Sequence, residues 1–290
     1  MPRARALPRS FEVPLMRDFS NDTRFLAINS ATVKAWSLKE LVDGCARAGI
    51  AAIAPWRDIV QAAGPAQAGR IIRDAGLVAT GLCRGGLFPA ANEAGRRAAI
   101  EDNKRAVDEA AAIGAQCLVL IAGGLPKGSR DLAGAHAQVR DGLAALLPYA
   151  QQAGVALALE PLHPMYAADR ACVNTLAHAN DLCDELDGLG IALDAYHVWW
   201  DPDLPRQIAR AGRRVISYHV CDWLVPTTDF LLDRGMMGDG VIDLKGLRKL
   251  VEAQGYAGHV DVEIFSASNW WTRDPDEVLR VCLDRFRTVV

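Results

Sequence analysis

Four ionisable side chains close four apolar segments in the second half of the chain. Glu160 ends ALALE, Asp194 ends GIALD, His219 ends ISYH and Glu263 ends VDVE. Burying such groups beside apolar residues is costly unless they satisfy one another or bind a cation. Three carboxylates held together would repel each other, whereas a divalent ion would keep all three ionised. We therefore predict that these four residues bind one divalent metal ion.

The donor set of this predicted site limits the choice of metal. Carboxylate oxygens with one imidazole suit Mn²⁺ first, with Mg²⁺, Co²⁺ and Zn²⁺ as alternatives. The seven cysteines contain no CxxC pair, so neither a thiolate zinc site nor a disulfide framework is expected. A single strand-end carboxylate is more often a helix cap or an ion-pair partner. The metal prediction therefore depends on all four residues occurring together.

Short apolar segments of strand length recur along the whole chain. Some of them, such as CLVLIA and ALALE, are apolar at successive positions, as parallel strands covered on both faces require. We expect eight strands, at residues 25–29, 51–56, 77–83, 117–122, 156–160, 191–194, 215–220 and 260–264.

Amphipathic segments separate these strands. The first begins at SLKE, where Ser37 caps a helix with Glu40 at the reciprocal capping-box position, and it ends at Gly49. The pattern predicts further helices at residues 94–113, 131–153, 175–186, 244–254 and 275–286. Strands and helices therefore alternate to the end of the chain.

This alternation predicts an α/β fold of one kind, the (β/α)₈ TIM barrel, since eight βα units in 290 residues are typical of it. A doubly wound sheet is the alternative, but no GxGxxG fingerprint follows the first predicted strand. We predict a single-domain barrel over residues 24–290, preceded by an N-terminal arm over residues 1–23. Barrel enzymes carry their catalytic groups at the carboxyl ends of the strands, where the four predicted ligands occur.

The order of the polar motifs resembles the xylose isomerase-like TIM barrel superfamily. This superfamily includes ketose 3-epimerases, hydroxypyruvate isomerases, inosose dehydratases and the endonuclease IV branch. The resemblance spans the barrel, and its specific motifs are Glu160, Asp194-Ala-Tyr-His197, His219, Asp233-Arg234 before Gly238-Asp239-Gly240, and Glu263. As in the epimerase branch, it implies that the four predicted ligands bind the metal and that His197 and Arg234 hold substrate oxygens. It further implies that Glu160 and Glu263 transfer protons on opposite faces of the substrate carbon.

These roles favour a divalent-metal-dependent sugar isomerase or epimerase. A proton next to a ketose carbonyl is too weakly acidic to leave at neutral pH unless the enediolate is stabilised, here by chelation to the metal. The alternative is a metal-dependent lyase or dehydratase acting on a keto-sugar or 3-keto-glycoside, in which elimination follows the same proton abstraction. That alternative needs an acid for the leaving group, and His163 is the candidate. A third hypothesis is a sugar-binding barrel without enzymatic activity.

Several residues near the strand ends have two interpretations each. His163 is either a second acid or base or a cap of its loop. Arg170 either binds substrate or pairs with Asp169 or Glu185. Trp56 and Trp223, with Trp199 and Trp200, are expected to be aromatic walls that flank a sugar, or else core or oligomer contacts.

The overall composition excludes some classes of partner. The net charge of −3 does not favour nucleic acid. The endonuclease branch needs histidines on early strands and one after its Asp-Arg pair, whereas the first histidine here is His136 and Gly235 follows Arg234. No apolar segment is long enough for a signal peptide or a membrane span, so we expect a cytoplasmic protein. The family resemblance implies a homo-oligomer acting on a small sugar or keto-sugar.

Overall fold

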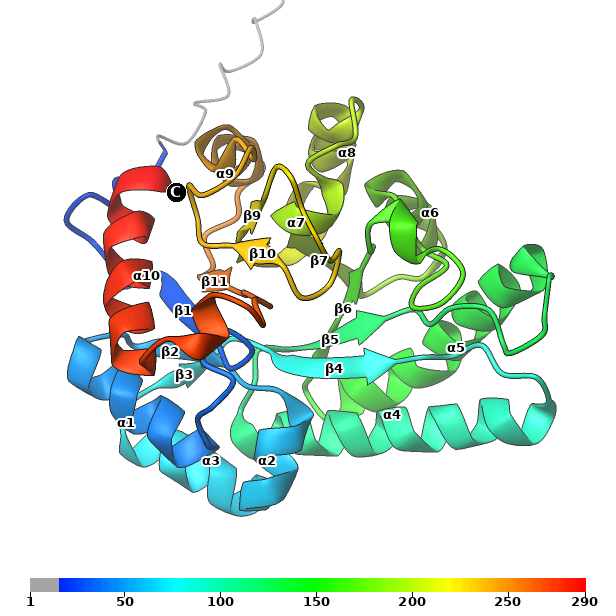
Figure 1. The fold of residues 1–290 in the computed structure, drawn as a ribbon. Coiled ribbons are helices and arrows are strands. Elements are labelled where there is room, and N and C mark those ends of the chain that lie inside the picture. Colours follow the sequence, from blue (N-terminus) through cyan, green and yellow to red (C-terminus); the bar gives the residue numbers. More distant parts are fainter. Residues whose placement is uncertain (1–15) are drawn as a thin grey trace, which may run out of the picture.

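The predicted barrel is confirmed by a computed structural model, which describes residues 16–290. Nine parallel strands follow the order β3-β2-β1-β11-β8-β7-β6-β5-β4, and the helices lie outside them (Figure 1). Most strand residues are buried, as expected for strands covered on both faces. The strands are β1 Leu26–Asn29, β2 Ala52–Ala54, β3 Val78–Ala79, β4 Leu82–Gly86, β5 Cys117–Ile121, β6 Ala156–Glu160, β7 Leu189–Asp194, β8 Val215–Val220 and β11 Val260–Val262.

The third predicted strand, 77–83, is divided into β3 and β4. Its first part pairs with β2 and its second part with β5, and a bridge between Trp56 and Cys83 joins the two edges of the sheet. Thr80 lies at the break and donates its hydroxyl to the buried carboxylate of Asp261 at 2.9 Å. The nine strands therefore occupy the eight positions of a (β/α)₈ barrel.

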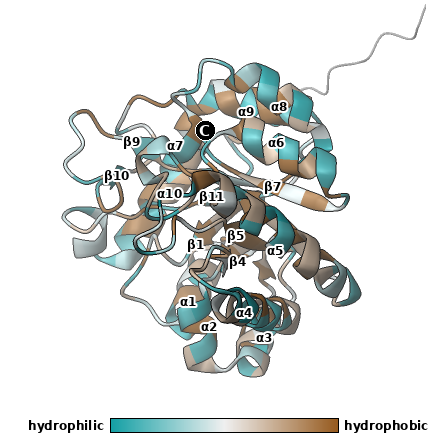
Figure 2. Ribbon diagram, turned by 90° about the vertical axis from the view of Figure 1, so that its right-hand side faces the viewer, coloured by the Kyte–Doolittle hydropathy of each residue, from teal (hydrophilic) through white to brown (hydrophobic). Residues whose placement is uncertain are grey.

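The helices confirm the six predicted ones and add four that the pattern did not place, α2, α3, α7 and α8. Ser37 and Glu40 form the predicted capping box, and Gly49 ends α1 in the left-handed conformation. Hydrophilic and hydrophobic residues alternate along the helices (Figure 2), as expected for helices packed on a barrel. The helices are α1 Leu38–Ala48, α2 Arg57–Ala63, α3 Pro65–Asp74, α4 Glu93–Ile113, α5 Leu132–Gln152, α6 Leu176–Glu185, α7 Ala195–Val198, α8 Leu204–Ala211, α9 Leu244–Ala253 and α10 Pro275–Val289, with single 3₁₀ turns at Pro164–Tyr166, Gly212–Arg214 and Trp270–Thr272.

The strand register brings the predicted ligands to one end of the barrel. Glu160 and Asp194 are the last residues of β6 and β7, His219 is the penultimate residue of β8, and Glu263 directly follows β11. Asp194 pairs with His219 across β7 and β8. Above this end, β9 (Asp222–Trp223) and β10 (Arg234–Gly235) form a short antiparallel pair.

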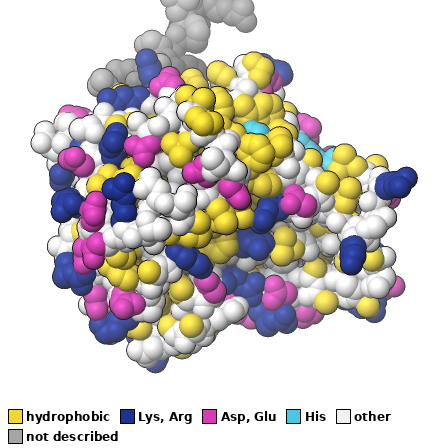
Figure 3. All heavy atoms as spheres, in the orientation of Figure 1, with side chains coloured by type: hydrophobic (Ala, Val, Ile, Leu, Met, Phe, Trp, Pro, Cys, Tyr) yellow, Lys and Arg dark blue, Asp and Glu magenta, His cyan; other side chains and the backbone are white. Residues whose placement is uncertain are grey.

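The predicted arm falls largely on residues 1–15, which lie outside the described residues. Of the remainder, Phe19 is buried and stacks on Phe286 of α10 with ring centroids 4.4 Å apart, and Arg17 forms an ion pair with Glu252. Charged side chains of both signs are distributed over the face shown in Figure 3. Within residues 16–290, no helix is both long and apolar enough to cross a membrane.

Candidate metal centre

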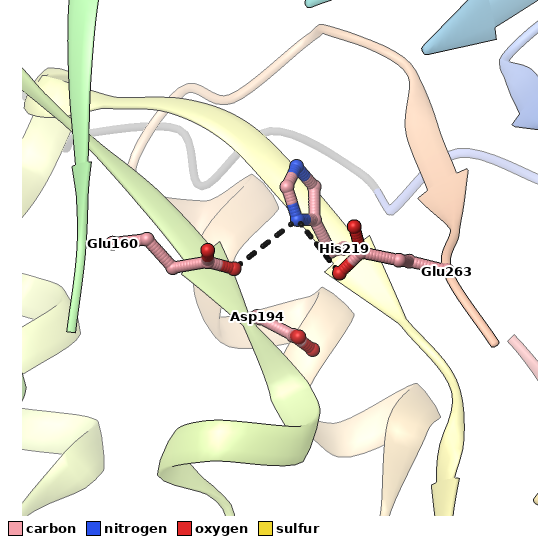
Figure 4. A group of neighbouring side chains, drawn as sticks. All are labelled: Glu160, Asp194, His219 and Glu263. Atoms are coloured by element: carbon pink, nitrogen blue, oxygen red, sulfur yellow. Dashed lines mark ion pairs between the residues drawn. The ribbon is translucent and has the colours of Figure 1, made fainter. Parts of the chain in front are cut away.

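The four predicted ligands meet at the carboxyl end of the barrel. Each offers one ligand atom, and these atoms all lie within 4.8 Å of one another. Figure 4 shows Glu160 and Glu263 approaching the imidazole of His219 from opposite sides, with Asp194 beside them. All four residues are buried. Three carboxylates gathered away from water, with one imidazole among them, suit a bound cation.

Two atoms at the centre of this cluster have no hydrogen-bond partner among the described residues. They are Glu160 Oε1 and His219 Nδ1, which face each other at 3.4 Å. The other ring nitrogen, Nε2, lies 2.9 Å from the hydroxyl of Ser217, so Nδ1 is the ring nitrogen that faces the cluster. Because buried polar atoms in proteins are nearly always satisfied, the two unpaired atoms fit a metal site, with Nδ1 as the ligand atom.

Without a cation, the ligands change one another's protonation. Burial raises the pKa of Glu263 to about 7, and the carboxylate of Glu160 acts in the same direction. Burial opposes a charge on His219, yet the carboxylates of Glu160 and Glu263 raise the pKa of its imidazole to about 10. Burial also opposes the ionisation of Asp194, but Arg234 keeps the pKa of that carboxyl below its ordinary value. The metal-free site therefore holds protons that a metal would displace.

Glu263 is oriented from the other half of the barrel. The side-chain amide of Asn29, the last residue of β1, donates to Glu263 Oε1 at 2.9 Å. Asn29 is fully buried. It is absent from the predicted site, although it closes the first apolar segment just as the four ligands close theirs. A polar residue at a strand end is therefore the signal that would have found it.

Ser217 and Asp261 are two further site residues that sequence reasoning missed. Ser217 contacts His219 Nε2, and Asp261 Oδ2 lies 3.7 Å from the same nitrogen. Each lies two residues before a ligand on the same strand, and residues two apart in a strand share a face. The signal was a second polar residue in ISYH and VDVE, on the same face as the ligand.

Arg234 connects the ligand cluster with His197. Its Nη1 donates to Asp194 Oδ2 at 3.0 Å, and its Nη2 lies 3.2 Å from His197 Nε2. The guanidinium lies 4.3 Å from the ring centroid of Tyr196 and 4.9 Å from that of Phe265. These contacts hold a fully charged group next to the ligands.

His197 is held as a neutral imidazole. The backbone N–H of His163 donates to its Nδ1 at 3.2 Å, and Nη2 of Arg234 faces its Nε2 at 3.2 Å. Burial lowers the pKa of His197 to about 3, so the ring stays neutral near pH 7. His197 lines the cavity beside the cluster, where a neutral imidazole suits hydrogen bonding to a substrate hydroxyl.

A cavity of about 300 Å³ lies at the ligand cluster and includes Glu160 and Glu263 in its lining. His197 and Arg234 contribute polar groups to it, and the apolar part of its wall includes Trp56, Leu87, Ile121, Tyr166, Leu231 and Phe265. Its volume is at the lower end of the roughly 300–1,000 Å³ found for small-molecule sites. A single small molecule fits such a space better than a polymer.

The predicted substrate contacts fall into two groups. Trp56, His197 and Arg234 line the cavity, as does Arg170. Trp223 and His163 stack on each other with ring centroids 4.9 Å apart, and neither is among the described residues that line the cavity. His163 Nδ1 accepts from the backbone N–H of Met165, and burial lowers the pKa of the ring. The contact that His163 makes with the site is thus its backbone bond to His197, and its role as an acid stays a prediction.

The family that is described as the xylose isomerase-like TIM barrel matches residues 42–287. The chain belongs to this family. A search of curated proteins finds no match. Among solved structures, protein SMc04130 from Sinorhizobium meliloti 1021 is 59% identical, with a TM-score of 0.91 over 92% of this chain and 99% of that one.

Two more distant family structures share the fold. The IolI protein, solved with a bound zinc atom, is 21% identical, with a TM-score of 0.78 over 91% of this chain and 97% of that one. The 3-keto-D-glucoside 4-epimerase YcjR from E. coli is 21% identical, with a TM-score of 0.73 over 91% of this chain and 99% of that one. At this level of identity the likeness extends to the fold alone.

Proposed function

We propose that this protein is a divalent-metal-dependent sugar isomerase or epimerase that moves a proton next to a carbonyl group. The observation that carries the proposal is the meeting of four ligand atoms within 4.8 Å beside a cavity of about 300 Å³. A divalent ion held by Glu160, Asp194, His219 and Glu263 would supply Lewis-acid stabilisation of the negative charge that develops on a substrate oxygen. Mn²⁺ is the ion we propose, and the zinc of IolI makes Zn²⁺ the first alternative.

Glu160 and Glu263 are proposed as the acid and base pair. Both line the cavity, and they approach the cluster from opposite sides (Figure 4). One carboxylate would remove the proton next to the carbonyl, and the other would return a proton to the enediolate from the opposite face. The hydrogen bond from Asn29 keeps Glu263 oriented towards the cluster.

Two neighbouring groups would orient the substrate. The neutral His197 would form a hydrogen bond with a substrate hydroxyl, and Arg234 would add positive charge near the enediolate. Trp56 and Phe265 form part of an apolar wall that would lie along the carbon side of a sugar ring. YcjR is a 3-keto-D-glucoside 4-epimerase, which supports a keto-sugar as the substrate class.

The first test is metal analysis of the purified protein, followed by proton–deuterium exchange measured by NMR. The substrates are a panel of ketoses and 3-keto-glycosides, each with and without added Mn²⁺. Metal-dependent exchange without elimination is the expected result. Elimination products would instead establish the lyase or dehydratase alternative, and the absence of both metal binding and exchange would refute the proposal.

Glu263→Gln tests the acid and base assignment. Because positioned acid or base groups contribute roughly 10²–10⁴-fold, exchange should slow by about that factor while the fold is retained. The matched control is Glu101→Gln, which removes an exposed carboxylate that pairs with Lys104 on α4. An unchanged exchange rate in Glu263→Gln protein that still binds metal would end the assignment.

A further inference from the structure

Arg84 lies in the cavity wall because of a local irregularity in β4. Along the β4–β5 pair, Cys83 is opposite Val119 and Gly85 is opposite Leu120, so Arg84 is an extra residue without a partner in β5. Such a bulge re-aims side chains, and bulges often occur next to active sites. Cys83 and Arg84 are neighbours in sequence, yet both line the cavity. In a regular strand, two successive side chains would point to opposite faces.

Gly85, the residue after the bulge, also faces the opposite side of the sheet from the one that a regular strand would give it. A Cβ on Gly85 would lie 2.7 Å from Asn103 Oδ1 of α4 and 2.8 Å from Leu120 Cδ2. Position 85 therefore faces the helices outside the barrel and accepts only glycine without a shift. The packing of α4 against Gly85 thus fixes the bulge, which in turn directs Arg84 into the cavity.

Arg84 is a partly buried cation that forms no ion pair or side-chain hydrogen bond within residues 16–290. Its guanidinium lies 5.9 Å from the ring of Trp56. Arg84 also lines a second cavity, and the two carboxylates in the lining of that cavity are already paired, Asp58 with Lys34 and Asp102 with Arg57. Burial lowers the pKa of Arg84, and the nearby charge of Arg170 lowers it further. Among residues 16–290, Arg84 therefore has no carboxylate in ion-pair contact, and the charge of Glu160 in the same cavity only partly offsets its burial.

Arg170 provides a second positive charge in the same cavity wall. Its loop is tied down by backbone hydrogen bonds from Leu125 to Ala168 and from Cys172 to Gly123. The nearest carboxylate contact of Arg170 is with Asp169, at 3.9 Å between Oδ2 and Nε, and both side chains are largely exposed. This distance exceeds that of a hydrogen bond, so the guanidinium donors of Arg170 remain available for a ligand.

Of the three arginines that line the cavity, Arg234 is in a close ion pair, whereas Arg84 and Arg170 are not. Arg234 is paired with Asp194 at the ligand cluster, and the remaining ligand carboxylates would be neutralised by a divalent ion. Apart from the cluster carboxylates Glu160 and Glu263, the described lining of the cavity gives Arg84 and Arg170 only the exposed Asp169 as an acidic neighbour. Arginine forms bidentate, charge-assisted hydrogen bonds with carboxylate and phosphate groups.

We infer that the substrate is a small ketose that carries an anionic group, a carboxylate or a phosphate, which Arg84 and Arg170 bind while the keto end lies at the metal. The inference rests on the proposed function for the keto end, and it names the substrate class of that site. Arg84 is the specificity-determining residue, since the bulge holds it in the wall. Arg170, being more exposed, contributes less.

The test compares three matched ketoses with the metal-loaded protein. D-Fructose is neutral, D-fructuronate carries a carboxylate in place of its terminal hydroxymethyl group, and D-fructose 6-phosphate carries a phosphate there. Proton–deuterium exchange gives kcat/KM for each compound, and calorimetry gives its Kd independently of turnover. We expect one of the anionic ketoses to exceed D-fructose by roughly 10–100-fold in kcat/KM and in 1/Kd, as for hydrogen bonds to charged groups. The preferred compound identifies the anion as carboxylate or phosphate.

Arg84→Gln tests the assignment of the residue. In this variant, kcat/KM for the anionic ketose relative to that for D-fructose should fall roughly 10-fold or more, and so should the same ratio of 1/Kd. Arg84→Lys should restore part of both ratios. The control is Arg206→Gln, which removes an exposed arginine that pairs with Asp203 and leaves the ratio unchanged. Circular dichroism and metal content confirm that each variant is folded and loaded.

The outcomes separate this inference from the proposed function. If all three ketoses exchange and bind equally, or if Arg84→Gln leaves the ratio unchanged, the anion site is refuted while the proposed isomerase or epimerase stands. If no compound exchanges but an anionic ketose binds in an Arg84-dependent way, the anion site stands and the proposed reaction fails. If neither anionic ketose binds more tightly than D-fructose, the inference is overturned whatever the exchange result.

Discussion

The two halves of the barrel contribute different kinds of residue to the same cavity. In the second half, the neighbouring strands β6, β7, β8 and β11 bring Glu160, Asp194, His219 and Glu263 to one level. In the first half, the third strand is broken between β3 and β4 and bulged at Arg84. Regular parallel strands bring their last residues together, which suits a set of metal ligands. A bulged strand instead re-aims single side chains, which suits a cavity wall that contacts a substrate.

The largest expected effect is on the free energy of unfolding and concerns the buried ion pair between Arg234 and Asp194 in the second half. Asp194→Asn should lower the free energy of unfolding of the metal-free protein by about 3 kcal/mol, because it removes the nearer carboxylate from buried Arg234 and leaves only Glu263 at 3.5 Å. Urea unfolding measures the change. The control, Asp276→Asn, breaks the exposed pair with Arg47 and should cost at most about 1 kcal/mol. Equal losses in the two variants would contradict the distinction between a buried and an exposed pair.

The next effect concerns the support of the imidazole ligand. Ser217→Ala removes the hydrogen-bond partner of His219 Nε2, and metal affinity should fall roughly 10–100-fold as for other residues behind metal ligands. Metal titration followed by calorimetry gives the affinity. Ser30→Ala is the matched control from the first half, since Ser30 is also buried and accepts from the backbone N–H of Trp56. A similar loss in both variants would mean that the two halves share the support of the metal.

The pH dependence of metal binding tests the protons held at the ligand cluster. The raised pKa values of Glu263, about 7, and His219, about 10, mean that a metal displaces protons from both residues. Between pH 7 and 10 one proton is displaced, so affinity should rise about tenfold per pH unit. Below pH 7 a second proton is displaced and the slope should steepen. Calorimetry in two buffers of different ionisation enthalpy counts the protons, and a count of zero at pH 8 would contradict this account.

The same pKa shifts set the sign of the stability change in the metal-free protein. Because the folded pKa of His219 is raised from 6.5 to about 10, its stabilising contribution is full below pH 6.5 and is lost as the pH rises towards 10. The raised pKa of Glu263 acts in the same direction between about 4.5 and 7. The lowered pKa of His197 acts in the opposite direction, but only below about pH 6.5. Metal-free protein should therefore lose stability as the pH rises from about 6.5 to 10, and urea midpoints that rise over this range would argue against these shifts.

The smallest expected effect belongs to the first half and concerns stability alone. Ser37→Ala removes the capping box of α1 and should lower the free energy of unfolding by about 1 kcal/mol. Metal affinity should stay the same, because α1 contributes no ligand. Thermal unfolding and metal titration of the same variant check both statements. A changed metal affinity would show that the first half positions the ligands more directly than its contacts indicate.

Sequence patterns identified the four residues of the candidate metal site because their positions follow from topology. In a parallel barrel the carboxyl ends of all strands meet at one edge, so a polar residue that closes an apolar segment must lie near the others. Asn29 follows the same rule, and its contact with Glu263 could have been predicted. Ser217 and Asp261 follow it less obviously, since each lies two residues before a ligand on the same strand face.

The sequence by itself determined the barrel, its alternating strands and helices, and the four polar residues that meet at its strand ends, because each depends on local periodicity and chain order. The tertiary structure alone decided the directions of side chains near the cavity. Arg84 faces inward only because a bulge packs Gly85 against α4, and His163 stacks on Trp223 outside the cavity lining. Such directions depend on contacts between residues far apart in the chain, which no local pattern records.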